Sequence, residues 1–124
     1  MPTKPDPAKK AQAAAEAIRT LNHITLNGKL TAPQISSTVQ ALTALTDRMP
    51  QTLLQLADQL DQRARQDEIC MDTGEHPAKP VSTALAALAT ATGCLAELSN
   101  ALHQAASPLF SMAHQDAAAA RTNR

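Results

Sequence analysis

The sequence predicts an all-α protein: an antiparallel helical bundle built on a long two-helix hairpin plus a short N-terminal helix, completed by dimerisation. Alanine supplies 26 and leucine 15 of the 124 residues, whereas residues that favour strands are scarce. The 11 basic and 11 acidic side chains cancel, and Phe110 is the one aromatic residue. Two stretches of similar length repeat apolar residues in steps of three and four, which is the helical period.

The length fits one domain. We expect a disordered N-terminus over residues 1–6, a single helical-bundle domain over residues 7–115 and a frayed tail over residues 116–124. Residues 1–10 are polar and include three prolines, so they lack the apolar core of a secretory signal, and we expect a cytoplasmic location. From Val81 the uncharged stretch ends at Glu97, short of the about 20 residues that a bilayer requires, so we predict no membrane span.

The first helix begins at Asp6 and Pro7, because an aspartate accepts hydrogen bonds from the free amides of a helix start and proline suits the first turn. We expect it to end near Asn22, with His23 in the C-terminal cap. An alternative is that a group of polar side chains at this end forms a contact surface for a partner: Asn22, His23 and Thr25.

The second helix is expected over residues 33–66, after a capping box formed by Thr31 and Gln34. Its apolar seam continues through Pro50 without a change of phase, so we favour a kink in one helix over a break between two. The predicted seam consists of Ile35, Val39, Leu42, Thr46, Met49, Leu53, Leu56 and Leu60.

The third helix is expected over residues 80–113, and its seam likewise continues through Pro108. A second stripe of small residues runs beside that seam, which predicts burial against more than one partner. Within this stripe the candidates for close packing between the subunits of an oligomer are Ala84, Ala87 and Ala91. The predicted seam consists of Val81, Leu85, Leu88, Thr92, Leu95, Ser99, Leu102, Ala106, Leu109 and Ala113.

The densest group of chemically active side chains lies in the second loop: Cys70, Asp72, Glu75 and His76. One thiol and one imidazole among carboxylates do not match a structural zinc site, and a cysteine nucleophile would need an oriented third group. We therefore predict no catalytic residue, no metal and no cofactor. Cys70 and Cys94 are not expected to pair within one chain, because about 20 Å of helix would separate them.

Several short segments resemble small helical proteins of unknown function encoded by actinobacteria. The resemblance rests on Leu21-Asn22-His23-Ile24-Thr25, Pro33, Leu42-x-x-Leu45, Met49-Pro50-Gln51-x-x-Leu54-Gln55-Leu56, Asp72-x-Gly74 and Pro77. It implies a cytoplasmic helical protein, associated with mobile genetic elements such as conjugative plasmids. It implies no catalytic residue.

These observations predict a non-enzymatic interaction or accessory protein that forms a homo-oligomer and binds an unknown protein partner. The alternative is a DNA-associated regulator. Zero net charge argues against it, and the best basic cluster, Arg63 and Arg65, is offset by Asp58, Asp61 and Asp67.

Overall fold

The computed structural model describes residues 4–113. Three helices make up this part of the chain: α1 (Pro7–Asn27), α2 (Ala32–Arg65) and α3 (Ala78–Phe110). The all-helical prediction is confirmed, and no strand occurs within the described range. The predictions for the tail, residues 116–124, and for the first three residues of the N-terminus concern residues outside this range. The chain divides into two units, one containing α1 up to Thr31 and one beginning at Ala32.

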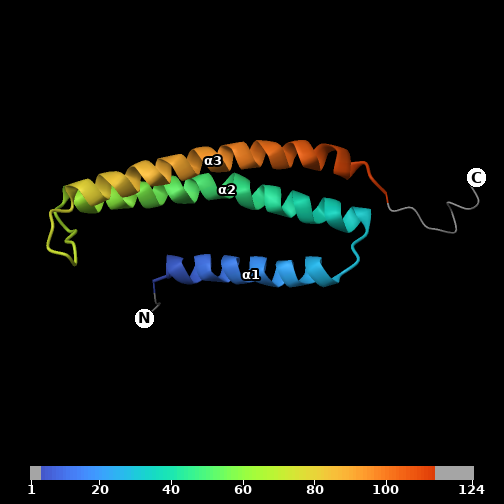
Figure 1. Cartoon of the computed structure of the whole chain (residues 1–124), viewed down its shortest axis with the longest axis horizontal. Helices are drawn as coiled ribbons and strands as arrows, with labels where there is room; N and C mark the ends of the chain where they lie inside the picture. Colours follow the sequence, from blue (N-terminus) through green and yellow to red (C-terminus); the bar gives the residue numbers. More distant parts are fainter. Residues whose placement is uncertain (1–3, 114–124) are drawn as a thin grey trace, which may run out of the picture. The chain divides into compact units, whose positions relative to one another are not determined.

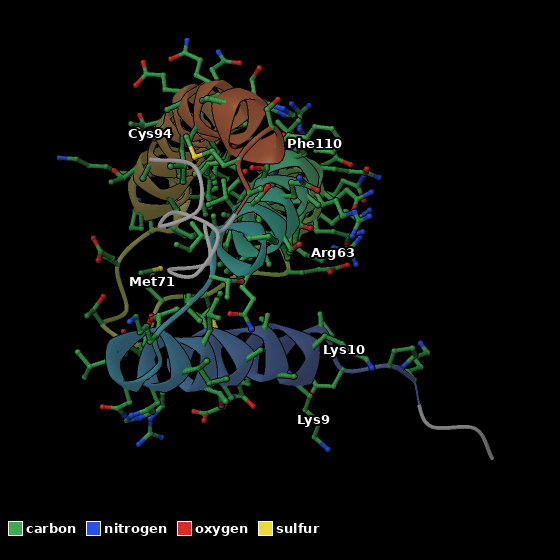
Figure 2. All side chains as sticks on the ribbon, turned by 90° about the vertical axis from the view of Figure 1, so that its right-hand side faces the viewer. Lys9, Lys10, Arg63, Met71, Cys94 and Phe110 are labelled. Carbon is green, nitrogen blue, oxygen red and sulfur yellow. The ribbon has the colours of Figure 1, made fainter. Side chains whose placement is uncertain are left out.

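The start of α1 agrees with the sequence prediction. The Asp6 side chain accepts a hydrogen bond of 3.0 Å from the amide of Ala8, and Pro7 occupies the first turn. The side chains project from a helix that has no buried residue, with Lys9 and Lys10 in its first turns (Figure 2). A helix of this kind obtains little stabilisation from its own unit.

The predicted end of α1 near Asn22 was wrong. The helix continues for more than one turn to Asn27 and is capped by Gly28, whose amide donates to the Ile24 carbonyl at 2.9 Å. A Cβ atom at position 28 would lie 2.8 Å from that carbonyl oxygen, so glycine fits this cap without displacing the last turn. His23 therefore lies inside the helix rather than in its cap.

Helices α2 and α3 form the predicted antiparallel hairpin (Figure 1). Both contain an internal proline, Pro50 in α2 and Pro108 in α3, and both continue through it. The expectation of one helix on each side of the loop is therefore confirmed. Since Pro50 has no amide hydrogen, the carbonyl of Thr46 lacks its usual partner in the helix.

The end of α2 is closed by a Schellman motif. Asp67 adopts the left-handed conformation with φ 55°, the amide of Glu68 donates to Arg63 O at 3.0 Å, and the amide of Asp67 donates to Ala64 O at 3.1 Å. The side chains of Arg63 and Glu68 also form an ion pair of 3.3 Å. This motif ends α2 and directs the chain into the loop.

The line along which α3 faces α2 is the predicted seam. Its members from Val81 to Leu109 are buried or half-buried, whereas Ala113 lies beyond the helix and is exposed. Val81 is the one buried apolar residue in the described chain. The hairpin therefore has a thin core.

The corresponding line of α2 differs from the predicted seam at every second position. Ile35, Met49 and Leu56 are exposed, whereas Ser36 and Thr43 are buried in their place. The buried threonine hydroxyls already have partners, since Thr43 Oγ1 donates to Val39 O at 2.7 Å and that of Thr46 to the Thr43 carbonyl at 2.9 Å. We call the observed set the contact line of α2: Ser36, Val39, Thr43, Thr46, Pro50, Leu53, Ala57 and Leu60.

Candidate interaction surface

The two sides of the hairpin differ in chemistry. On one side a polar cluster joins the two helices: Ser99 Oγ donates a hydrogen bond to Asp47 Oδ1, and His103 Nε2 lies 3.0 Å from Asp47 Oδ2. The hydrogen bond from Ser99 is the main cause that lowers the pKa of Asp47, and His103 adds to it. Since these three groups come from both helices, the cluster fixes how α2 and α3 align.

This cluster is not a catalytic triad. In a triad the histidine lies between the nucleophile and the carboxylate, so that it can take the nucleophile's proton. Here Asp47 holds both Ser99 and His103, and the serine donates to the carboxylate. The arrangement suits alignment of two helices rather than nucleophilic attack.

Sequence analysis did not find this cluster, because Asp47 and His103 are 56 positions apart and their meeting depends on the antiparallel register. A heptad alignment of the two helices would have placed both beside the contact line.

The opposite side of the hairpin is apolar. On α2, Asp47 directly follows a contact-line residue of its turn, whereas Leu42 and Met49 directly precede one, which places them on the other flank. On α3, His103 likewise directly follows a residue of the line that faces α2, whereas Ala91 directly precedes one. Because Asp47 and His103 meet on one side, the other flanks of the two helices share the second side.

We call this second side the apolar face. Its apolar members on α2 are large: Ile35, Leu42, Leu45, Met49 and Leu56. Thr38 and Thr52 occupy the same helix position as Leu45. Its members on α3 are mostly small: Ala84, Ala87, Ala91, Cys94, Leu98, Ala101 and Ala105. The largest side chains are well exposed, Leu56 at 48% and Leu98 at 47%.

Charged residues in these segments avoid the apolar face. Between residues 35 and 56 of α2 the charges are Asp47 and Arg48, and between residues 84 and 105 of α3 the one formal charge is Glu97. All three occupy other helix positions. A continuous apolar surface of this length is uncommon on a monomeric protein and marks a binding surface.

The predicted packing residues Ala84, Ala87 and Ala91 all lie on the apolar face. Ala87 is exposed and the other two are half-buried. The structure therefore places them on one surface, and their role in an oligomer stays a prediction. The expected burial of this stripe against a further partner is not met within the described chain.

The predicted partner-contact residues Asn22, His23 and Thr25 are exposed on α1. The hydroxyl of Thr25 donates to the carbonyl of Asn22 at 3.2 Å, so these two residues lie on the same side of the helix. Their contact with a partner stays a prediction.

The second loop brings together no ligand set. Among residues 4–113, no three His, Cys, Asp or Glu side chains are grouped closely enough to hold a metal ion. His76 Nδ1 accepts from the amide of Ala78 at 3.2 Å, which supports the start of α3. Cys70 and Cys94 are both free and exposed. A shallow pocket of about 350 Å³ lies at this end of the hairpin and includes Asp61, His76 and Val81 in its lining.

The basic residues considered for DNA binding are already paired with carboxylates. Arg65 Nε lies 2.8 Å from Asp61 Oδ2, and Arg63 pairs with Glu68. These pairs reduce the positive potential that a phosphate contact requires. No observation on this part of the chain favours the DNA-binding alternative.

Helix α3 is the one helix of the described chain that is long and apolar enough to cross a membrane. The prediction of no span counted residues only as far as Glu97, but the two charges of this 33-residue helix, Lys79 and Glu97, are compatible with a span by length and composition. The core helix of a soluble bundle meets the same criterion. The apolar face contributes seven residues to this apolar character.

Comparison with known proteins finds no matching protein family, no matching curated protein and no matching solved structure.

Proposed function

We propose that this chain is a non-enzymatic, cytoplasmic interaction protein, whose α2–α3 hairpin binds protein partners through the apolar face. The observation that carries the proposal is that one side of the hairpin holds a hydrogen-bonded polar cluster, whereas the helix positions of the apolar face carry no charge between residues 35 and 56 of α2 and between residues 84 and 105 of α3. The polar cluster at Asp47 aligns the helices on one side, and the apolar face leaves leucine side chains such as Leu98 exposed on the other. The resemblance to accessory helical proteins of actinobacteria agrees with such a role.

A protein partner agrees with the chemistry of this face better than a nucleic acid does. Nucleic acids require positive charge and often aromatic side chains that stack on bases. The apolar face has neither, because its members are aliphatic residues, one cysteine and one methionine. Aliphatic stripes at helical spacing are typical of surfaces that receive another helix.

The test compares the same substitution on the two sides of the hairpin. Leu98 on the apolar face and Leu54 away from it are both well exposed, at 47% and 58%. We expect Leu98→Lys to remove the proteins that co-purify with the tagged chain from its host, and Leu54→Lys to retain them. The same set of proteins with both variants would contradict the proposal.

The membrane provides the competing outcome, since α3 meets the criterion for a span. Flotation with vesicles of neutral phospholipid tests it directly. The proposal predicts that the purified chain stays with the soluble fraction. Flotation of wild type and Leu54→Lys, but not of Leu98→Lys, would assign the apolar face to lipid and overturn the proposal.

A further inference from the structure

We propose that the apolar face is covered by a second copy of this chain, with the large residues of α2 in one copy packed on the small residues of α3 in the other. This inference rests on the proposed function of the apolar face and names its occupant. The twofold axis would run along the hairpin, so that both loops lie at the same end of a four-helix bundle.

The area of the face lies at the lower end of what a dimer needs. Its members span residues 35–56 of α2 and residues 84–105 of α3, which is about 33 Å of each helix. Two helices at ordinary separation are roughly 20 Å wide together, so the face offers on the order of 650 Å². Stable protein interfaces take about 600 to 1,000 Å² from each partner, so two such faces reach this range.

The absence of charge on the apolar face also favours a second copy. In a twofold interface each surface meets itself, so a charged residue near the axis meets a like charge across it. A surface without charged residues avoids this repulsion. The apolar face contains no charged residue, although charges occur on the same helices at Asp47, Arg48 and Glu97. Self-association is therefore opposed by no like-charge repulsion at these positions.

Side-chain size selects the arrangement. Ile35, Leu42, Met49 and Leu56 form a row of large residues on α2, and α3 presents mostly alanines. Packing like on like would place two rows of alanines opposite each other and two rows of large side chains opposite each other, which requires unequal helix separations. With Asp47 level with Ser99, packing α2 on the partner's α3 places a large side chain beside a small one at Leu42 with Ala105 and at Leu56 with Ala91, whereas Met49 meets Leu98.

The register identifies a pair to test. Asp47 lies level with Ser99 in the hairpin, because the two side chains are hydrogen bonded. Leu56 and Ala91 are both about two turns from that pair toward the loop. With the twofold axis along the hairpin, Leu56 of one copy therefore lies opposite Ala91 of the other.

The experiment is a size exchange measured by sedimentation equilibrium of the full chain. Wild type is expected to have twice the chain mass. Ala91→Leu and Leu56→Ala should each weaken the dimer, by about tenfold in Kd or more, since an added or missing side chain disturbs the packing. The double variant Leu56→Ala/Ala91→Leu exchanges large and small across the interface, so its Kd should return toward that of wild type.

The control is Ala86→Leu, the same substitution on α3 at an exposed position away from the apolar face. It should leave the Kd unchanged. Circular dichroism reports the helix content of each variant, and recovery of both helix content and dimer mass in the double variant supports the pairing even where a single variant loses structure.

Three results would overturn the inference. They are a monomeric wild type at all concentrations, single variants with unchanged Kd, and a double variant whose losses simply add. A monomeric wild type whose co-purifying proteins still depend on Leu98 would remove the second copy alone and leave the proposed function in place. Loss of that dependence as well would remove both.

Discussion

The two sides of the α2–α3 hairpin use the same helices for different tasks. On the side of Asp47, polar groups from both helices form hydrogen bonds within the chain. On the side of the apolar face, side chains such as Met49 and Leu98 remain 39% and 47% exposed. The polar groups at Asp47 therefore bond within the chain, whereas the apolar face leaves apolar area for an external partner.

The origin of this difference is local. Asp47 and His103 each directly follow a contact-line residue, in a set of positions that mixes polar and apolar side chains. The residues that directly precede the other contact-line positions, such as Met49 and Leu98, are all apolar. A helix turns by about 100° per residue, so these two sets lie on opposite flanks of the same contact line. The chemistry of each side therefore depends on which residues stand next to the contact line, and it can differ between the sides without a change of fold.

The largest expected effect distinguishes the contact line from the apolar face. Leu95 belongs to the line of α3 residues that faces α2. Leu95→Ala should lower the free energy of unfolding by about 2 kcal/mol, because it empties space between α2 and α3. Leu98→Ala on the apolar face should cost less than half as much in dilute solution, where no partner covers it. Urea unfolding followed by circular dichroism measures both, and equal losses would show that the two positions are equivalent in folding.

A second expected effect concerns Pro50, which lies on the contact line. Because α2 is continuous through this residue, Pro50→Ala should restore a hydrogen bond to the carbonyl of Thr46 and raise the free energy of unfolding by about 1 kcal/mol. Thermal unfolding gives the result as a higher Tm. A clear fall in Tm would contradict this prediction. It would mean that packing of the proline ring on α3 stabilises the fold by more than the restored hydrogen bond does.

A third prediction strengthens the hairpin while leaving both of its sides unchanged. Asp67 holds a left-handed conformation in the Schellman motif, which glycine adopts without steric cost. Asp67→Gly should raise the free energy of unfolding by about 0.5 kcal/mol, after allowance for the greater freedom of glycine in the unfolded chain. Urea unfolding again measures it, with Asp58→Gly within α2 as a control that should destabilise the chain.

The smallest expected effect is a dependence on pH that comes from the polar side alone. The pKa of Asp47 is lowered in the folded chain from an ordinary value of 3.8, chiefly by the hydrogen bond from Ser99. The folded state therefore binds this proton less readily than the unfolded state does. The resulting stabilisation is complete above the ordinary pKa and is lost as the pH falls through the lowered pKa.

Asp47→Asn should remove this part of the pH dependence and lower the Tm slightly at neutral pH. Thermal scans between pH 2 and pH 7, about the range over which carboxylates titrate, measure the effect. Ser99→Ala should act in the same direction, because it removes the main cause of the shift. Unchanged pH dependence in both variants would show that the cluster does not align the helices.

Much of the fold follows from sequence patterns. The apolar repeat of α3 identified its contact line from Val81 to Leu109, because one phase of the repeat there is clearly richer in leucine than its neighbour. The start of α1 followed from Asp6 and Pro7, since capping depends on adjacent residues. Local chemistry was sufficient in both cases.

The contact line of α2 was only half predicted for a physical reason. Two phases of the repeat share Val39, Thr46, Leu53 and Leu60. The first phase adds larger residues such as Ile35 and Met49, whereas the second adds smaller ones such as Ser36 and Thr43. Hydrophobicity favours the first, but close approach of two helices favours the second, and that choice depends on the partner helix. The apolar face consists in part of the residues that this choice left outside.

The most direct test of the account uses the two native cysteines. Cys70 in the loop and Cys94 on the apolar face are both free and exposed in the single chain. If a second copy covers the apolar face, Cys94 should react with a thiol reagent much more slowly than Cys70 in concentrated solution, and should approach its denatured-state rate on dilution. Cys70 should react quickly throughout. Protection of Cys94 that is the same in concentrated and dilute solution, or no protection at any concentration, would contradict a second copy on the apolar face.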